Sequence, residues 1–441
     1  MLRVAADILR QKELRNKILV TIALLAVFRL GAWLPIPMVN YDLFRDWFQR
    51  QASGALGAVF GMMGMITAGS LSRATVFSLG IMPYISASII MQLLTKVIPA
   101  MKELSEEGGS GRRKINQYTR FLTVAICIVQ SMVACIYIAN QGTPTQVLYQ
   151  GSRSSFIFMG MMTITTGTII LMWIGEQISE FGIGNGISLI IMVGIISRIP
   201  AGLIEAIKSF SFAPEGAGEF GVGVAVVLMG LFLAILFSVV YIYLGKRMIP
   251  VQYGRQVRGR KVMGGQKQAL WLRVNQAGVI PVIFASALMT APVVISRLIR
   301  LDVFNYQSFE YNVLYVLLII FFAYFYTSMV FNPDELADQL KEHGSFVPGY
   351  RAGKKTADFF RDTMVHLTFV GAVFLAAVAI LPKILSGFIR IQFLMYTSLF
   401  GGVGLLIVIG VSLDLMQKIQ EHFYMRDYGG FLKKKLKGRR R

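Results

Sequence analysis

Long apolar stretches separated by shorter polar segments run through most of the chain. A helix needs about 20 mainly apolar residues to cross a bilayer. Ten stretches meet this requirement: 18–36, 74–98, 119–139, 155–178, 184–206, 220–244, 271–296, 310–332, 364–385 and 396–416. An eleventh, 55–69, is too short to span and contains glycines that disfavour a helix, which fits a re-entrant segment enclosed by protein or water. The pattern predicts an all-α membrane protein with ten transmembrane helices and a short re-entrant helix.

The composition favours a chain whose surface largely faces lipid. Of its 441 residues, 55% are hydrophobic and only 15% are charged, whereas a soluble domain has about 25% charged residues. The basic N-terminus leads into an apolar run that is too long for the core of a signal peptide, so we expect no cleaved leader. Both cysteines, Cys127 and Cys135, lie in one apolar stretch, so we expect buried packing without a disulfide or metal site.

The basic residues are divided unequally between the two sides of the predicted membrane. With the N-terminal segment 1–17 inside, the inside segments hold 32 Lys and Arg residues and the outside segments hold 8. Because cytoplasmic segments are enriched in Lys and Arg, we expect both termini, including the basic tail 417–441, in the cytoplasm. The net charge of +21 is therefore mainly a topology signal. Two inside loops, 246–270 and 333–362, are longer than topology requires, which favours a binding surface.

A short motif occurs twice in the chain. Residues 80–88 and 278–286 share the pattern Gly-x-x-Pro-x-Ile-x-Ala-Ser. In the predicted topology the two copies run in opposite directions through the membrane, which implies two inverted five-helix halves. We expect the prolines of the two copies, Pro83 and Pro281, to remove one helix hydrogen bond each and to kink their helices where the halves meet.

Ionisable residues are almost absent from the predicted spans. Glu176, Glu180 and Asp414 fall near cytoplasmic ends, whereas transporters of protons, ions or charged solutes place such groups near the midplane. The three histidines have no metal partner at a useful spacing, and no set of Ser, His and Asp is visible, so we expect neither an enzyme nor a metal or cofactor site. A channel closed by an apolar constriction fits best. A secondary transporter with inverted repeats and, third, a membrane enzyme are the alternatives.

Several long motifs resemble the SecY family, whose members form the central subunit of the bacterial protein-conducting channel. They are Leu71-Ser-Arg-Ala-Thr, Gly80-Ile-Met-Pro-Tyr-Ile-Ser-Ala-Ser, Gly108-Gly-Ser-Gly-Arg-Arg-Lys-Ile, Gly182-Ile-Gly-Asn-Gly-Ile-Ser, Arg273-Val-Asn-Gln-Ala-Gly-Val-Ile-Pro, Phe331-Asn-Pro and Phe346-Val-Pro-Gly. The resemblance covers nearly the whole chain, and its third and last motifs favour the bacterial form. It implies that the halves 18–206 and 220–416 close like a clamshell around an hourglass pore in the bacterial plasma membrane.

The resemblance also implies which residues line the pathway. An apolar ring at the pore waist would consist of Ile81, Ile85, Ile187, Ile191, Ile283 and Ile407. A plug beneath the ring would include Phe60, Gly61, Met62, Met63, Gly64, Met65 and Ile66. A lateral gate towards lipid would be lined by Ser86, Ile90, Gln92, Gln130, Asn275 and Phe284. A hydrogen bond between Asn275 and Gln130 would help to hold this gate shut.

The same resemblance implies the partners and the function. Ribosomal RNA and the motor ATPase SecA would dock on the two long inside loops through Arg255, Arg258, Arg260 and Arg351. A SecE-like and a SecG-like subunit, signal sequences, preproteins and membrane lipid are the other expected partners. The implied function is to translocate unfolded preproteins and to release hydrophobic segments laterally into the bilayer. SecA with ATP, or the translating ribosome, would drive it.

Overall fold

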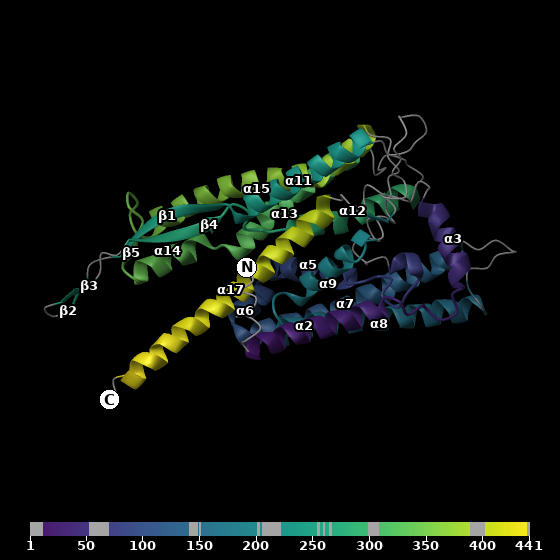
Figure 1. Ribbon diagram of the computed structural model, residues 1–441, viewed down its shortest axis with the longest axis horizontal. Helices are drawn as coiled ribbons and strands as arrows, with labels where there is room; N and C mark the ends of the chain where they lie inside the picture. Colours follow the sequence, from purple (N-terminus) through teal and green to yellow (C-terminus); the bar gives the residue numbers. More distant parts are fainter. Residues whose placement is uncertain are drawn as a thin grey trace. The chain divides into compact units, whose positions relative to one another are not determined.

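The computed structural model describes residues 12–52, 70–140, 149, 151–200, 203–204, 222–253, 256–258, 261–263, 267–298, 308–388 and 402–438 (Figure 1). The chain divides into two compact units. The first comprises Met1–Lys208, Thr397–Leu399 and Val411–Arg441, and the second comprises Ser209–Tyr396 and Phe400–Gly410. The predicted plug residues, Phe60 to Ile66, lie outside the described residues.

The described part of the chain is mostly helical. The helices of the first unit are α2 (Lys12–Gly31), α3 (Tyr41–Ala52), the 3-10 helix η1 (Leu71–Arg73), α5 (Met82–Val97), α6 (Pro99–Glu106), α7 (Gly109–Ala139), α8 (Arg153–Phe181) and α9 (Gly186–Ile196). Those of the second unit are α11 (Val222–Leu244), α12 (Ile280–Leu298), α13 (Phe309–Val330), α14 (Pro333–Glu342) and α15 (Lys354–Phe388). Helix α17 (Gly402–Gly438) begins in the second unit and continues in the first.

Each of the ten apolar stretches overlaps one of these helices. By length and composition, five of the described helices are able to cross a membrane: α7, α8, α13, α15 and α17. Helices α5 and α6 make a sixth if they are counted as one span with a 99° bend. Helix α9 and the segments Met229–Leu244 and Ile280–Met289 are apolar but shorter. A mostly helical protein with several apolar spans is thus confirmed, whereas ten spans and the clamshell stay predictions.

The repeated motif adopts the same local conformation in both copies. Gly80 and Gly278 have φ angles of 57° and 63°, in the left-handed region that favours glycine. Pro83 and Pro281 are each the second residue of the helix that follows, α5 and α12. The prediction that these prolines kink their helices is wrong, because a proline in the first turn removes no intrahelical hydrogen bond. The prolines start the helices, and the residues before them form turns.

Two helices of the first unit approach each other closely through small side chains. A Cβ atom on Gly160 of α8 would lie 2.7 Å from Sγ of Cys135 on α7. Cys127 and Cys135 are buried and free, as predicted. The core at this end continues onto α3, which contributes Phe44 and Phe48. Helix α3 was not predicted from the sequence, although its apolar residues recur at helical spacing.

The second unit contains a small sheet that the sequence analysis did not predict. Strand β1 (Lys246–Tyr253) pairs antiparallel with β4 (Lys267–Arg273) and with β5 (Ser345–Phe346), in the order β4-β1-β5 (Figure 1). Strands β2 (Gln256–Arg258) and β3 (Lys261–Met263) form a second antiparallel pair within the same connection. One face of the three-stranded sheet is buried against the first turns of α15, and the core there comprises Ile249, Val251, Leu272, Val347, Phe360 and Met364.

Candidate functional site

Helix α5 holds two predicted ring residues and three predicted gate residues. Ile81 caps its N-terminus, and the carbonyl of Ile81 accepts a hydrogen bond from the Ile85 amide at 3.1 Å. Both isoleucines are buried, and their four-residue spacing puts them one turn apart on one face. Ser86 and Ile90 have the same spacing on a neighbouring face, where the Ile90 side chain is 40% exposed. The helix thus presents one buried face and one adjacent face that is open in this unit.

The remaining gate residues of the first unit are two glutamines. Gln92 on α5 donates from Nε2 to Oγ of Ser88 at 3.1 Å. Oε1 of Gln92 is buried and has no hydrogen-bond partner among the described residues. Gln130 lies on α7, which packs against α5, and its side chain is partly buried. A buried acceptor without a donor is costly, so Oε1 of Gln92 is the predicted gate atom whose hydrogen bonding is unsatisfied among the described residues.

The second pair of ring residues in this unit is positioned by the start of α9. The side chain of Asn185 accepts hydrogen bonds from the amides of Ile187 at 3.1 Å and Ser188 at 3.4 Å, which caps the helix. Ile187 and Ile191 then lie one turn apart, and Ile191 is buried. A Cβ on Gly175 of α8 would lie 3.1 Å from Cγ1 of Ile187, so this ring residue also packs on α8.

The last two ring residues belong to the second unit. Ile283 lies in the first turns of α12 and is partly buried. Ile407 on α17 is buried, as is its neighbour Leu406, whereas Leu405 is only partly buried. Burial therefore does not separate Ile407 from Leu406 as the ring residue. Because the six isoleucines are divided between the two units, their assembly into one ring stays a prediction.

The gate residues of the second unit have partners of their own. Nδ2 of Asn275 donates to the carbonyl of Gly278 at 3.1 Å, which closes the turn before α12. The ring of Phe284 packs edge-on against Phe322 and Tyr326 of α13. Asn275 thus stabilises the left-handed turn of the repeated motif. Its predicted hydrogen bond to Gln130 would join the two units and stays a prediction.

An ion pair between two helices of the first unit was not predicted. Oε1 of Glu176 on α8 accepts a hydrogen bond from Nε of Arg120 on α7 at 2.8 Å, and Oε2 lies 2.8 Å from Nη2. Such two-point contacts are the strongest geometry for a carboxylate and a guanidinium. Both charges also act on Tyr84 of α5. The only sequence signal was a carboxylate and a guanidinium at matching depths of two neighbouring apolar stretches.

Local contacts support the backbone of the loop that contains Arg351. Gly349 and Gly353 on either side have φ angles of 89° and 95°, which glycine adopts without strain. Oγ1 of Thr356 donates to the Arg351 carbonyl at 2.9 Å. The ring centroids of Tyr350 and Phe359 are 4.2 Å apart. The fixed backbone leaves the Arg351 side chain exposed.

The other three predicted docking arginines are in the β1–β4 connection. Arg258 is the last residue of β2 and pairs in register with Lys261 of β3. Arg255 and Arg260 lie outside the described residues. The register places the backbones of two basic residues, Arg258 and Lys261, opposite each other at the end of this two-stranded ribbon.

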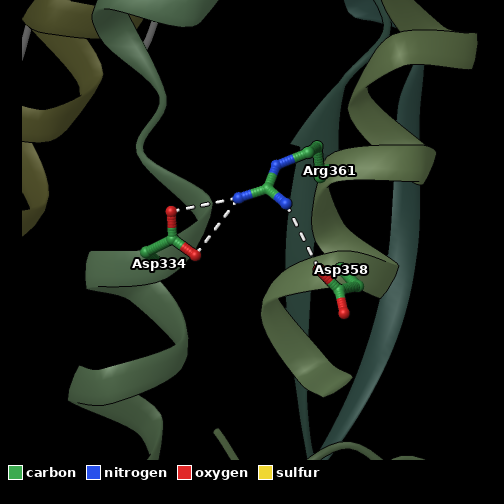
Figure 2. A network of polar contacts seen from close by, with 3 residues as sticks. All are labelled: Asp334, Asp358 and Arg361. Atoms are coloured by element: carbon green, nitrogen blue, oxygen red, sulfur yellow. Dashed lines mark hydrogen bonds and ion pairs between the residues drawn. The ribbon is translucent and has the colours of Figure 1, made fainter. Parts of the chain in front are cut away.

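The two long loops form one folded body, here called the loop platform: β1, β4, β5, α14 and the first turns of α15. Gln252 of β1 pairs in register with Phe346 of β5, which joins the loops through backbone hydrogen bonds. Figure 2 shows a contact within the loop 333–362, in which Nη2 of Arg361 on α15 lies 3.1 Å from Oδ2 of Asp334 on α14, and Nη1 lies 3.2 Å from Oδ1 of Asp358. Exposed pairs contribute about 0–1 kcal/mol, so the buried core of the loop platform supplies most of its stability.

Among the described residues, no group of three or more His, Cys, Asp or Glu side chains is arranged to hold a metal ion. The polar clusters that the structure does show are ion pairs between helices, such as Arg120 with Glu176 and Arg361 with Asp334. They suit positioning of helices and loops, and they lack the nucleophile and base of a hydrolytic site.

Known proteins resemble this chain over most of its length. The SecY family model matches residues 75–416. The protein translocase subunit SecY of Mycobacterium tuberculosis (strain ATCC 25618 / H37Rv) is 40% identical over 455 residues, which cover 98% of this chain and 100% of the relative. The subunit of the same name from Aquifex aeolicus (strain VF5) is 39% identical over 433 residues, which cover 96% and 97%.

Two solved structures share the fold. "The structure of a protein conducting channel" aligns with a TM-score of 0.65 at 17% identity and covers 93% of each chain. "Sec61 in the Canine ribosome-channel complex from the endoplasmic reticulum" aligns with a TM-score of 0.59 at 17% identity and covers 92% of each chain. The family match, the full-length relatives and the shared fold give one conclusion: the chain belongs to the SecY family.

Proposed function

We propose that this chain is a protein-conducting channel that translocates unfolded preproteins across the bacterial plasma membrane and releases hydrophobic segments laterally into lipid. The observation that supports this most strongly is identity of about 40% over the full length of protein translocase subunits. The chain acts in this scheme as a passive pathway without chemistry of its own. ATP hydrolysis by SecA, or elongation by the ribosome, supplies the driving force.

The proposed waist consists of Ile81, Ile85, Ile187, Ile191, Ile283 and Ile407. A pore that passes every kind of side chain must bind none of them strongly, and apolar side chains meet this condition. They also close around a chain, and a narrow apolar gap excludes ions because it dewets. A ring of charges would instead attract counter-ions and hold oppositely charged segments. The 55–69 segment is the proposed plug of the empty pore.

The proposed lateral gate lies between α5 with α7 and α12 with α13. The exposed Ile90 side chain and the unpaired Oε1 of Gln92 in the first unit fit a face that meets a partner surface when the gate is closed. A hydrogen bond between Asn275 and Gln130 would contribute only about 0.6 kcal/mol, the average for such bonds within membranes. A gate held by weak contacts opens when an apolar segment enters it.

The proposed dock for the driving partner is the loop platform with the β2–β3 ribbon. Arg351 is exposed on a fixed backbone, and Arg258 ends a strand of the ribbon. We place this surface in the cytoplasm together with both termini, in line with the 32 Lys and Arg residues of the inside segments. Ten spanning helices, a SecE-like subunit and a SecG-like subunit complete the proposed assembly in the inner membrane.

The test is translocation by reconstituted vesicles. Vesicles containing the chain with its accessory subunits are given SecA, ATP and a radiolabelled precursor, and external protease is then added. The channel predicts ATP-dependent protection of the precursor, and Arg351→Glu should reduce it without changing the amount of reconstituted chain. Uptake of a small solute without precursor protection would contradict the channel and favour a secondary transporter.

A further inference from the structure

Three arginines lie near one another at the end of the first unit where α2 and α9 finish. Arg29 is in the last turn of α2, Arg73 is in η1, and Arg198 follows α9. Backbone hydrogen bonds from Ile36 to Ala74 at 2.7 Å and from Val76 to Leu34 at 2.9 Å attach η1 to the end of α2. The positive charge of Arg73 acts on both of the other arginines. The cluster therefore concentrates three like charges.

None of these three arginines forms a side-chain hydrogen bond or an ion pair with another described residue. Arg120 and Arg361, in contrast, each bind carboxylates. Neighbouring like charges repel each other, and the repulsion strengthens as water is excluded. An anion that binds all three arginines would remove this repulsion.

The surroundings of the cluster fit the depth of lipid headgroups. Cζ of Arg73 lies 4.1 Å from the ring centroid of Trp33, and the indole is 63% exposed. Tryptophan is enriched at membrane interfaces, where an apolar ring and a polar edge are both accommodated. Leu30 and Leu34 beside it are 72% and 59% exposed, as expected of side chains that face acyl chains. The guanidinium of Arg73 and the exposed apolar side chains of Leu30 and Leu34 therefore lie at the same end of α2.

We propose that Arg29, Arg73 and Arg198 bind the phosphate of a phospholipid whose acyl chains lie against Leu30, in the last turn of α2, and Leu34, which follows the helix. A guanidinium binds phosphate oxygens through two parallel hydrogen bonds, and the stacked indole holds the Arg73 guanidinium in place. In the predicted topology this end faces outside, where basic residues are scarce. A bound phospholipid explains why three arginines occur together there. The proposal does not depend on the channel function.

The test is a lipid titration of the full chain, purified in detergent and freed of bound lipid. Short-chain phosphatidylglycerol is compared with diacylglycerol that has the same acyl chains but no phosphate, and with inorganic phosphate. Binding is read from the rise in the unfolding midpoint, because a ligand that binds only the folded state stabilises it. We expect phosphatidylglycerol to raise the midpoint and the other two ligands to leave it unchanged.

Variants locate the site. Arg73→Gln should weaken phosphatidylglycerol binding at least tenfold, and Arg73→Lys should weaken it less because the charge remains. Arg153→Gln is the matched control, because Arg153 lies on the same predicted side of the membrane and its guanidinium already donates to Oδ1 of Asn140 at 2.6 Å. This variant should bind phosphatidylglycerol as tightly as the wild type. If Arg73→Gln does not fold, Arg198→Gln replaces it. Equal stabilisation by diacylglycerol or by inorganic phosphate, or unchanged binding in the arginine variants, would overturn the proposal.

Discussion

Replacing Phe360 with alanine tests whether the two long loops function as one body. Phe360 is fully buried in the core of the loop platform, together with Ile249, Val251 and Leu272 of the sheet. A Phe→Ala change in a packed core costs about 3–5 kcal/mol, through lost apolar burial and the cavity that remains. Arg361→Ala, one residue further on, removes only the exposed contacts to Asp334 and Asp358, worth about 1 kcal/mol or less.

Hydrogen exchange of backbone amides measures the difference. A loss of 3 kcal/mol in local stability corresponds to about 100-fold faster exchange, since 1.4 kcal/mol is tenfold. In Phe360→Ala we expect this acceleration at the amides of Leu336 and Tyr350, which bond to Asn332 at 3.2 Å and to Val347 at 3.1 Å. Exchange in α7 and α8 should stay unchanged, which controls for global unfolding.

The same variants connect the loop platform to function. Phe360→Ala should abolish the part of SecA-driven precursor protection that depends on Arg351. Arg361→Ala should retain most of that protection. Exchange that accelerates equally in both variants would show that the ion pairs stabilise the loop platform as much as the core does. Unchanged exchange in Phe360→Ala would contradict the proposed single body.

Three further changes test the local structure through the unfolding midpoint in detergent. Gly80→Ala and Gly278→Ala should each lower stability by about 1 kcal/mol or more, because both positions require a left-handed backbone. Gly230→Ala is their control: a Cβ there meets no atom within 4 Å, so the change should be neutral or stabilising by up to about 1 kcal/mol. Arg120→Gln should cost about 1 kcal/mol, and adding Glu176→Gln should cost little more, which a double-mutant cycle detects as coupling.

The apolar pattern located the helices because membrane helices satisfy their own backbone and depend little on distant contacts. The motifs likewise identified the family before any fold was known. The repeated Gly-x-x-Pro was found in the sequence, but its meaning was misread. A proline indicates a kink only where a helix has already begun before it. Gly80 and Gly278 adopt the left-handed conformation, so in both copies the helix begins after the glycine and only one residue before the proline.

The sheet of the loop platform could not be found in the same way. Strand β5 has two residues, Ser345 and Phe346, and its partner β1 lies about 90 residues earlier, so no local periodicity signals the pairing. The ion pair of Arg120 with Glu176 was missed for a related reason. Each residue looked like the ordinary charged end of a span, and only packing of α7 on α8 joins them.

Cross-linking to a stalled precursor tests the central claim most directly. In a chain whose Cys127 and Cys135 are replaced by alanine, single cysteines are placed at Ile85 and Ile283, and a precursor with one cysteine is arrested during transport. The control is a cysteine at Ile164, which is buried among α7 and α8 in the first unit. The proposed waist predicts disulfide adducts at Ile85 and Ile283 and none at Ile164. Adducts at Ile164 alone, or at none of the three, would contradict a pore lined by these isoleucines.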